Sequence, residues 1–316
     1  MLPYFPTPYP DELWYSVLCR FHIRSCNKSM LLNRSSEEPF FLFPNRSIFN
    51  ILQTLPEDVF DVKKLVINHT LFPYFCRIKP FEEKQRLLES VSQEKQVDFG
   101  WKTTPRTKQT LRYCPICQKE EVDRYGESYW HREHQLPFMT VCPRHHCRLI
   151  EYQRVTEWKQ SIVLPDFIET VGEPDFEVKE YESKLADMMY RYLVAPFELS
   201  PTKGYSNLDH ELEAKYRTVC GSRIGMIDTE KLYEDLVGFY GPQIIRSCFG
   251  GYFTQGLSMK LRSWNFPSPE RYIILATLIG QMPEETFGKP NAAGEYERQL
   301  CGSPYKRLRY KRQRTA

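Results

Sequence analysis

The sequence lacks the features that would assign it to a membrane, a secretory pathway or a common enzyme class. Its longest apolar runs, such as residues 272–279, fall far short of the roughly 20 residues that a membrane span needs, so no membrane partner is expected. No basic region followed by an apolar stretch opens the chain, so a secretory signal is not expected. The phosphate-binding, dinucleotide and nucleophile-elbow motifs are absent. We therefore expect a protein that is not an enzyme.

A disulfide framework is also not expected, although the chain holds ten cysteines. Six of them are scattered, mostly through apolar or helix-like surroundings, where a free cysteine behaves as a small buried hydrophobe. Such usage fits a reducing, cytoplasmic compartment. These six are Cys19, Cys26, Cys76, Cys220, Cys248 and Cys301.

Acidic and basic residues nearly balance over the chain, and the positive net charge comes from the C-terminal end. The formal net charge is +3, and residues 305–316 carry six basic and no acidic side chains, so the rest of the chain has a net charge of −3. Such a basic tail, within residues 291–316, can contact phosphates. A solvated end is the alternative interpretation.

The N-terminal third predicts a small helical domain. After the proline-rich residues 1–10, apolar side chains follow at helical spacing, and we expect Asp11 to cap this helix. Because short loops join the helices, residues 1–108 predict a helix-turn-helix-like domain. The further helices are expected over residues 27–35, 47–55, 59–69 and 81–91.

The remaining chain divides into four further segments. In residues 109–155 the helical period is lost and cysteine and histidine concentrate, which predicts a zinc-finger or zinc-ribbon module with short β-like pieces at 128–131, 138–141 and 147–152. Residues 156–181, acidic and broken by prolines, predict a linker or exposed loop. Residues 182–290 predict a C-terminal helical domain with a helix-turn-helix-like pair, and the basic tail follows. Its helices are expected over residues 182–193, 208–220, 228–241 with Asp228 as the cap, 242–250 and 269–280. The fold class is therefore mostly α with a small amount of β.

Four cysteines and four histidines lie between Tyr113 and Leu149. Cys114 and Cys117 form a C-x-x-C pair, and Cys142 and His145 repeat the spacing as C-x-x-H. Two such pairs supply the tetrahedral Cys-Cys-Cys-His set that zinc prefers. Four protein ligands leave no open coordination position, so we expect a structural Zn²⁺ whose binding energy is folding energy.

Other ligand assignments stay open at the level of sequence. His146 or Cys147 could replace His145, although the spacing of Cys147 suits the turn poorly. His131 and His134 are expected to pack or to form hydrogen bonds rather than to bind a metal. If either did bind a catalytic metal, a zinc-dependent nuclease would be conceivable, but no carboxylate cluster of the two-metal type accompanies them in the sequence.

Three stretches resemble the TnsD/TniQ family of transposon target-selection proteins. They are PYFPTPYPDELWYSVLCR, NHTLFPYF and the segment from RYCPIC through CPRHHCRL. The likeness is strong over residues 1–155, weakens over 156–225 and partly returns up to residue 280, and it favours the TnsD branch. Two departures are visible: no second cysteine cluster follows the first, and long TnsD members extend well past this chain's end.

The resemblance implies a protein that selects the insertion site of a transposon. TnsD proteins bind a specific duplex DNA attachment site and recruit the AAA+ ATPase TnsC, and transposase subunits are further candidate partners. TniQ adaptors instead dock on an RNA-guided CRISPR effector complex and reach the same ATPase, which is the alternative function. On either reading the protein would be cytoplasmic, and nucleoid-associated when bound to DNA.

The resemblance also suggests site residues. The family's zinc ligands match Cys114, Cys117, Cys142 and His145. The region that we expect to face the ATPase runs from Pro6 to Arg20, and its candidate contacts are Pro8, Tyr9, Glu12, Leu13 and Trp14.

No motif assigns the DNA contacts, so candidates come from cations around the zinc module and near the later helix pair. For each one, a solvated or salt-bridged side chain is the alternative. Tyr129 and Trp130 are expected to pack the module rather than to stack on bases. The DNA-contact candidates are Arg112, Lys119, Arg124, Arg132, Arg144, Arg148, Lys260, Arg262 and Arg271.

Overall fold

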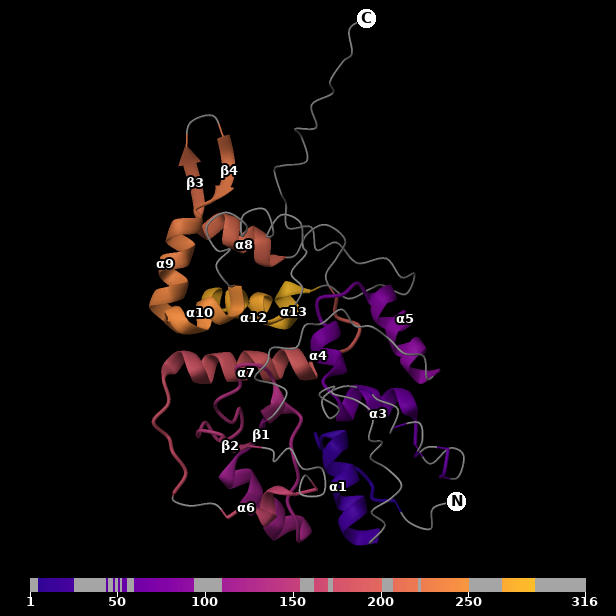
Figure 1. Cartoon of the computed structure of the whole chain (residues 1–316). Coiled ribbons are helices and arrows are strands. Elements are labelled where there is room, and N and C mark those ends of the chain that lie inside the picture. The colour runs from indigo at the N-terminus through magenta and orange to yellow at the C-terminus, as the bar shows by residue number, and fades with distance from the viewer. Residues whose placement is uncertain are drawn as a thin grey trace, which may run out of the picture.

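The computed structural model is mostly helical with a small amount of β-structure, as the sequence predicts (Figure 1). It contains no helix, within the described residues, that is long and apolar enough to cross a membrane. The predictions for residues 27–35, Lys260, Arg262 and the tail 291–316 lie outside the described part. The described residues are 5–25, 44, 48, 51, 53–55, 60–93, 110–153, 162–169, 173–200, 207–220, 223–249 and 269–287.

The N-terminal helices form where the apolar spacing predicts them, with one correction. Asp11 does not cap the first helix, which begins three residues later, because Asp11 sits in a turn with φ of 56° and its carboxylate bonds to the central module instead. Asp61 is a cap, and its carboxylate accepts from the backbone N–H groups of Lys63 and Lys64. The N-terminal helices are α1 (Trp14–Ser25), α3 (Val62–His69), α4 (Phe72–Cys76) and α5 (Phe81–Ser92).

The central module contains a helix that the sequence pattern did not predict. The inference that this region lacks a helix, drawn from the loss of helical period, was wrong. A Cys114 cap, a proline at the first helical position and a left-handed Gly126 at the end delimit α6. Of the three predicted β-like pieces, only the third overlaps a strand, which pairs antiparallel with a strand that opens the module. The elements are β1 (Thr110–Tyr113), α6 (Pro115–Tyr125), the 3₁₀ turn η2 (Glu133–Gln135), β2 (Ile150–Gln153) and the 3₁₀ turn η4 (Pro165–Phe167).

The C-terminal helices follow the predicted pattern except at residues 208–220. There the helix stops after α8, and residues Arg217–Cys220 pair with the next segment as an antiparallel hairpin, which suits the β-branched Thr218 and Val219. Asp228 caps α9 as predicted, accepting from Lys231 N at 3.0 Å. The elements are α7 (Glu180–Val194), α8 (Asn207–Lys215), β3 (Arg217–Cys220), β4 (Arg223–Ile227), α9 (Thr229–Tyr240), α10 (Pro242–Phe249), α12 (Pro269–Ile279) and α13 (Pro283–Thr286).

One apolar cluster runs through all three regions. Figure 1 shows α7 lying between the central module and the C-terminal helices. The cluster joins Leu13 of the N-terminal segment, Trp130 of the module, Met189 of α7 and Ile274 of α12, each of which is fully buried. The module therefore packs against the rest of the molecule through this core. Of the scattered cysteines, Cys19, Cys76 and Cys248 are free and buried, as predicted.

Candidate metal centre

The first ligand pair is positioned by the start of α6. Cys114 directly follows the strand β1 and caps the helix, and its Sγ accepts from the backbone N–H of Cys117 at 3.5 Å. Pro115 occupies the first helical position, where its missing N–H costs nothing. One helical turn therefore brings the two sulfurs of the C-x-x-C pair to the same side of the chain.

The second pair lies in a tight turn between Val141 and Arg148, which form an isolated β-bridge. Cys142 N donates to Cys147 O, and His146 N donates to Cys142 O, both at 2.9 Å. His146 has a φ of 51°, in the left-handed region. Because this turn reverses the chain just after His145, it directs the His145 ring back toward the cysteines and leaves His146 exposed.

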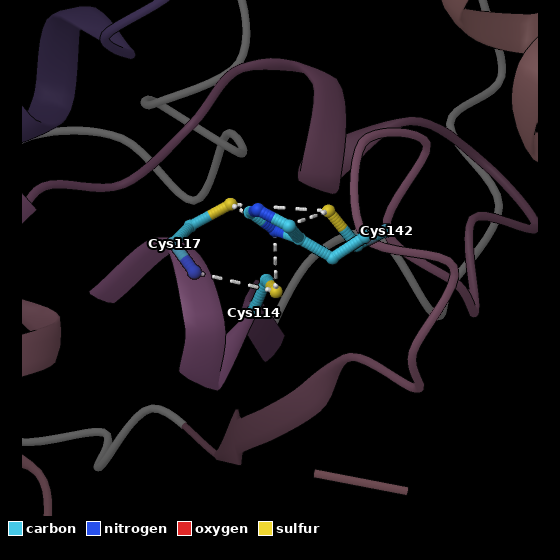
Figure 2. Close-up of side chains that lie close together, drawn as sticks. Cys114, Cys117 and Cys142 are labelled. Carbon is cyan, nitrogen blue, oxygen red and sulfur yellow. Dashed lines mark hydrogen bonds between the residues drawn. The ribbon is translucent and has the colours of Figure 1, made fainter. Parts of the chain in front are cut away.

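The four predicted ligand residues converge. Figure 2 shows the side chains of Cys114, Cys117 and Cys142 pointing toward one another. The three sulfurs and a His145 ring nitrogen all lie within 4.8 Å of one another. His145 Nδ1 lies 3.4 Å from Cys114 Sγ, 3.3 Å from Cys117 Sγ and 3.7 Å from Cys142 Sγ. The three cysteines are fully buried, so this cluster could hold a metal ion.

The chemistry of the donor set fits zinc. The hydrogen bonds of the neighbouring thiols depress the pKa of Cys114 far below its ordinary value, so this sulfur ionises first. The thiolate at Cys114 and burial in turn raise the pKa of Cys142 to about 12. A divalent cation would supply the positive charge that allows all three sulfurs to be thiolates. His145 also makes its other nitrogen available to a carboxylate, with Nε2 lying 3.2 Å from Glu120 Oε1, an arrangement typical of metal-bound histidine.

Cys147 lies closer to this cluster than its spacing suggested. Its sulfur is 3.4 Å from Cys114 Sγ, and the residue is fully buried. It is not among the four residues whose ligand atoms are all mutually close. His145 therefore completes the set of four, and Cys147 packs beside it.

A second group of polar residues lies next to the cluster, and the sequence did not reveal it. His131 is buried, its Nε2 forms a short hydrogen bond with Glu121 of α6, and its ring stacks on Tyr129 at a centroid distance of 4.5 Å. The contact with Glu121 confirms the prediction that His131 forms a hydrogen bond. The carboxylates of Asp11 and Glu133 also lie near it. Besides the two histidines, a local signal was Cys117 and Glu121 at i and i+4, whereas Asp11 is brought in from far along the chain.

The candidate ATPase-facing residues form the seam between the N-terminal segment and the module. Glu12, Leu13 and Trp14 are buried, while Pro8 and Tyr9 are partly exposed. Leu13 N donates to Trp130 O at 2.8 Å. Among the five candidates, the side chains that remain accessible are therefore those of Pro8 and Tyr9.

A buried ion network fastens the same seam. Arg20 donates to Glu12 Oε2 and Glu127 Oε1, each at 2.8 Å, and lies over the Tyr9 ring at 3.8 Å. Burial raises the pKa of Glu12 to about 7, although the Arg20 charge opposes the shift. Burial also opposes ionisation of Glu127, but hydrogen bonds from Arg20 and Arg24 outweigh it, so the Glu127 pKa is lowered.

The described DNA-contact candidates have different surroundings. Arg112 donates to the backbone oxygens of Leu136 and Met139, and buried Arg132 donates to the Asp11 carboxylate at 2.9 Å. Arg144 pairs with Glu120, Arg148 pairs with Asp175 and Glu182, and Arg271 donates to Cys248 O. Lys119 and Arg124 are exposed on α6. Tyr129 and Trp130 are buried and pack the module, as predicted.

Two comparisons with known proteins bear on this chain. Residues 3–149, which end just after the second ligand pair, match the family model described as TniQ. The chain is also 24% identical over 281 residues to the transposon Tn7 transposition protein TnsD of Escherichia coli. That alignment covers 81% of this chain and 51% of TnsD, so the chain spans about half the length of this relative. Residues 3–149 therefore form a TniQ-family segment, and the similarity to TnsD continues beyond it.

Proposed function

We propose that this chain selects the insertion site of a Tn7-type transposon by binding a specific duplex DNA attachment site and recruiting the AAA+ ATPase TnsC. The observation that carries the proposal is the TniQ match over a segment that ends in the Cys-Cys-Cys-His cluster. We assign Zn²⁺ to that cluster in a structural role, because its four protein donors leave no open position.

Two surfaces support duplex binding. In α6, directly after the first ligand pair, Lys119 and Arg124 expose their charges on a helix whose start would be fixed by the metal. In the C-terminal region, α10 follows α9 after Gly241, and its exposed face carries Gln243, Arg246 and Ser247. A polar, basic second helix after a tight turn is the arrangement that reads a major groove in helix-turn-helix proteins.

The seam between the N-terminal segment and the module supports the recruitment of the ATPase. Pro8 and Tyr9 lie at its surface, and the buried Arg20 network below holds them in place. A rigid, partly apolar edge of this kind suits a protein contact. We propose that TnsC contacts the chain here, while transposase subunits would join through the ATPase.

The test is footprinting on a library of chromosomal and plasmid fragments at several salt concentrations. We expect protection of one defined sequence and affinity that falls steeply with salt. Lys119→Gln combined with Arg124→Gln should reduce the salt slope by about two, whereas the exposed Lys63→Gln should leave it unchanged. Protection that is blind to sequence would contradict the proposal.

The alternative is a TniQ-type adaptor that links a CRISPR effector complex to the same ATPase and has little DNA affinity of its own. The TniQ match over residues 3–149 is the observation that favours it. Co-purification with an RNA-guided complex, together with the absence of sequence-specific footprints, would support the adaptor and overturn the selector. In both cases we propose that the chain is not an enzyme, and incubation with DNA and Zn²⁺, Mn²⁺ or Mg²⁺ should produce no cleavage.

A further inference from the structure

Beside the four-residue cluster, three further potential metal ligands lie close together: Asp11, His131 and Glu133. His131 Nδ1 lies 3.9 Å from Asp11 Oδ2 and 3.9 Å from Glu133 Oε1. The three ligand atoms all lie within 4.8 Å of one another. They share no residue with the Cys114, Cys117, Cys142 and His145 set, so this is a separate group of donors.

Two of the three atoms that face the centre of this group lack hydrogen-bond partners in the described part of the chain. His131 Nδ1 and Glu133 Oε1 are both buried without a partner, and the two residues are 3% and 2% exposed. His134, fully buried, also leaves both ring nitrogens unpartnered, and its Nε2 lies 3.7 Å from Glu133 Oε1. Buried polar atoms are normally paired, so several unpaired atoms around one point indicate an absent partner.

The charges around that point call for a cation. Asp11 and Glu133 both direct a carboxylate oxygen at it, and Arg132 neutralises only Asp11, through Nε and Oδ1 at 2.9 Å. Glu133 is left without an arginine or lysine within salt-bridge distance among the described residues. A buried carboxylate without a partner is strongly unfavourable, whereas a divalent cation would satisfy both carboxylates at once.

His131 is already oriented as a ligand. Its Nε2 is engaged by the Glu121 carboxylate, and its Nδ1 lies on the side of Asp11 and Glu133. A carboxylate holding the remote nitrogen is the arrangement that fixes the ring of a metal-bound histidine. Backbone bonds hold Asp11 in place as well, since Arg132 N donates to Asp11 O and Glu133 N donates to Asp11 Oδ2, both at 2.9 Å.

We propose that Asp11, His131 and Glu133 form a second divalent-metal site, which binds Zn²⁺ with His134 as the nearest further donor. Imidazole with carboxylates is an accepted zinc donor set. Zinc bonds of about 2.0–2.2 Å to nitrogen and oxygen would be reached by a contraction of a few tenths of an ångström. Because Asp11 belongs to the N-terminal segment, the ion would clamp this segment to the module. This site does not depend on whether the chain binds DNA.

The direct test is the metal content of the full-length, unmodified chain after saturation with Zn²⁺ and removal of free ion. Elemental analysis should find two equivalents of zinc per chain. Reconstitution with Co²⁺ separates the sites: the sulfur-to-cobalt charge-transfer band should be complete with one bound equivalent, and the second should add none. A total of one equivalent would overturn the proposal.

Two isosteric variants assign the second equivalent. Glu133→Gln and Asp11→Asn should each bind one equivalent of zinc and keep the full charge-transfer band, and asparagine tolerates the positive φ at position 11. Glu89→Gln, at an exposed ion pair on α5, is the matched control and should keep two. Two equivalents retained by Glu133→Gln and Asp11→Asn would place the second ion elsewhere and refute the site. If either variant does not fold, the count on the unmodified chain decides.

Discussion

The central module and the C-terminal helices bury different kinds of side chains. Between α7, α9 and α12 the buried residues are almost all apolar, such as Leu185, Leu236 and Ile274. In the module, by contrast, His131, Arg132 and other charged or polar residues are buried beside the sulfur cluster. The C-terminal region is therefore stabilised mainly by hydrophobic burial, whereas we propose that the module depends on a metal ion and on paired charges.

The largest expected effect is the loss of a metal ligand. Cys114→Ser should release the zinc and unfold residues 110–153, because structural zinc contributes roughly 10–16 kcal/mol in small zinc-binding folds. Elemental analysis and circular dichroism measure both changes. Cys147→Ser, in the same buried cluster but outside the set of four, should retain the ion. An unchanged zinc content in Cys114→Ser, or a lower one in Cys147→Ser, would refute the ligand assignment.

The next effect tests the paired charges of the seam. Arg20→Met leaves Glu12 and Glu127 without their main partner, and removing one member of a buried ion pair costs about 3–5 kcal/mol. Chemical denaturation measures the change in the free energy of unfolding. Adding Glu12→Gln and Glu127→Gln to Arg20→Met should recover part of the loss, since no carboxylate then stays unpaired. A loss below about 1 kcal/mol for Arg20→Met would show that the network is not essential.

A core substitution in the other region should leave the metal untouched. Leu236, on α9, is fully buried in the apolar cluster, so Leu236→Ala should lower the free energy of unfolding by about 2–5 kcal/mol. Its zinc content should stay equal to that of the unmodified chain. Loss of zinc from Leu236→Ala would mean that metal binding in the module depends on the packing of the C-terminal helices.

A smaller effect should appear in the pH dependence of stability. Burial raises the pKa of Glu12 to about 7 from 4.5, so between these values the folded chain binds a proton that the unfolded chain releases. Stability therefore falls as pH rises from about 4.5 to 7, by an amount on the order of 1–3 kcal/mol. Glu12→Gln should flatten this part of the profile in denaturation experiments. An unchanged profile would contradict the shift.

Local sequence signals predicted the parts of the fold and site that depend on neighbouring residues. The cap at Asp228 is confirmed, and the pairs Cys114–Cys117 and Cys142–His145, predicted from their spacing, come together in one cluster that could hold a metal ion. The helix α6 was missed because residues 114–125 are largely polar or charged and show no apolar stripe at helical spacing. Its boundaries come from the Cys114 cap and from Gly126.

Contacts between distant segments could not be predicted. Asp11 has the residue type and position of a helix cap, but its carboxylate is used by Arg132 and Glu133, more than a hundred residues away. The same long-range pairing brings the Asp11 and Glu133 carboxylates to His131, where the sequence showed only two histidines. Residues 217–220 were predicted as helix from the local pattern. They form strand β3 instead, because pairing with β4 outweighs that pattern.

The most direct test of the account is hydrogen exchange on the full chain before and after the metal is removed. We predict that chelation strips protection from the amides of residues 110–153, while those of α9 and α12 stay protected. Elemental analysis of the same sample must confirm that the ion has left. A metal-free chain in which residues 110–153 keep their protection would contradict the claim that a metal ion holds the module together.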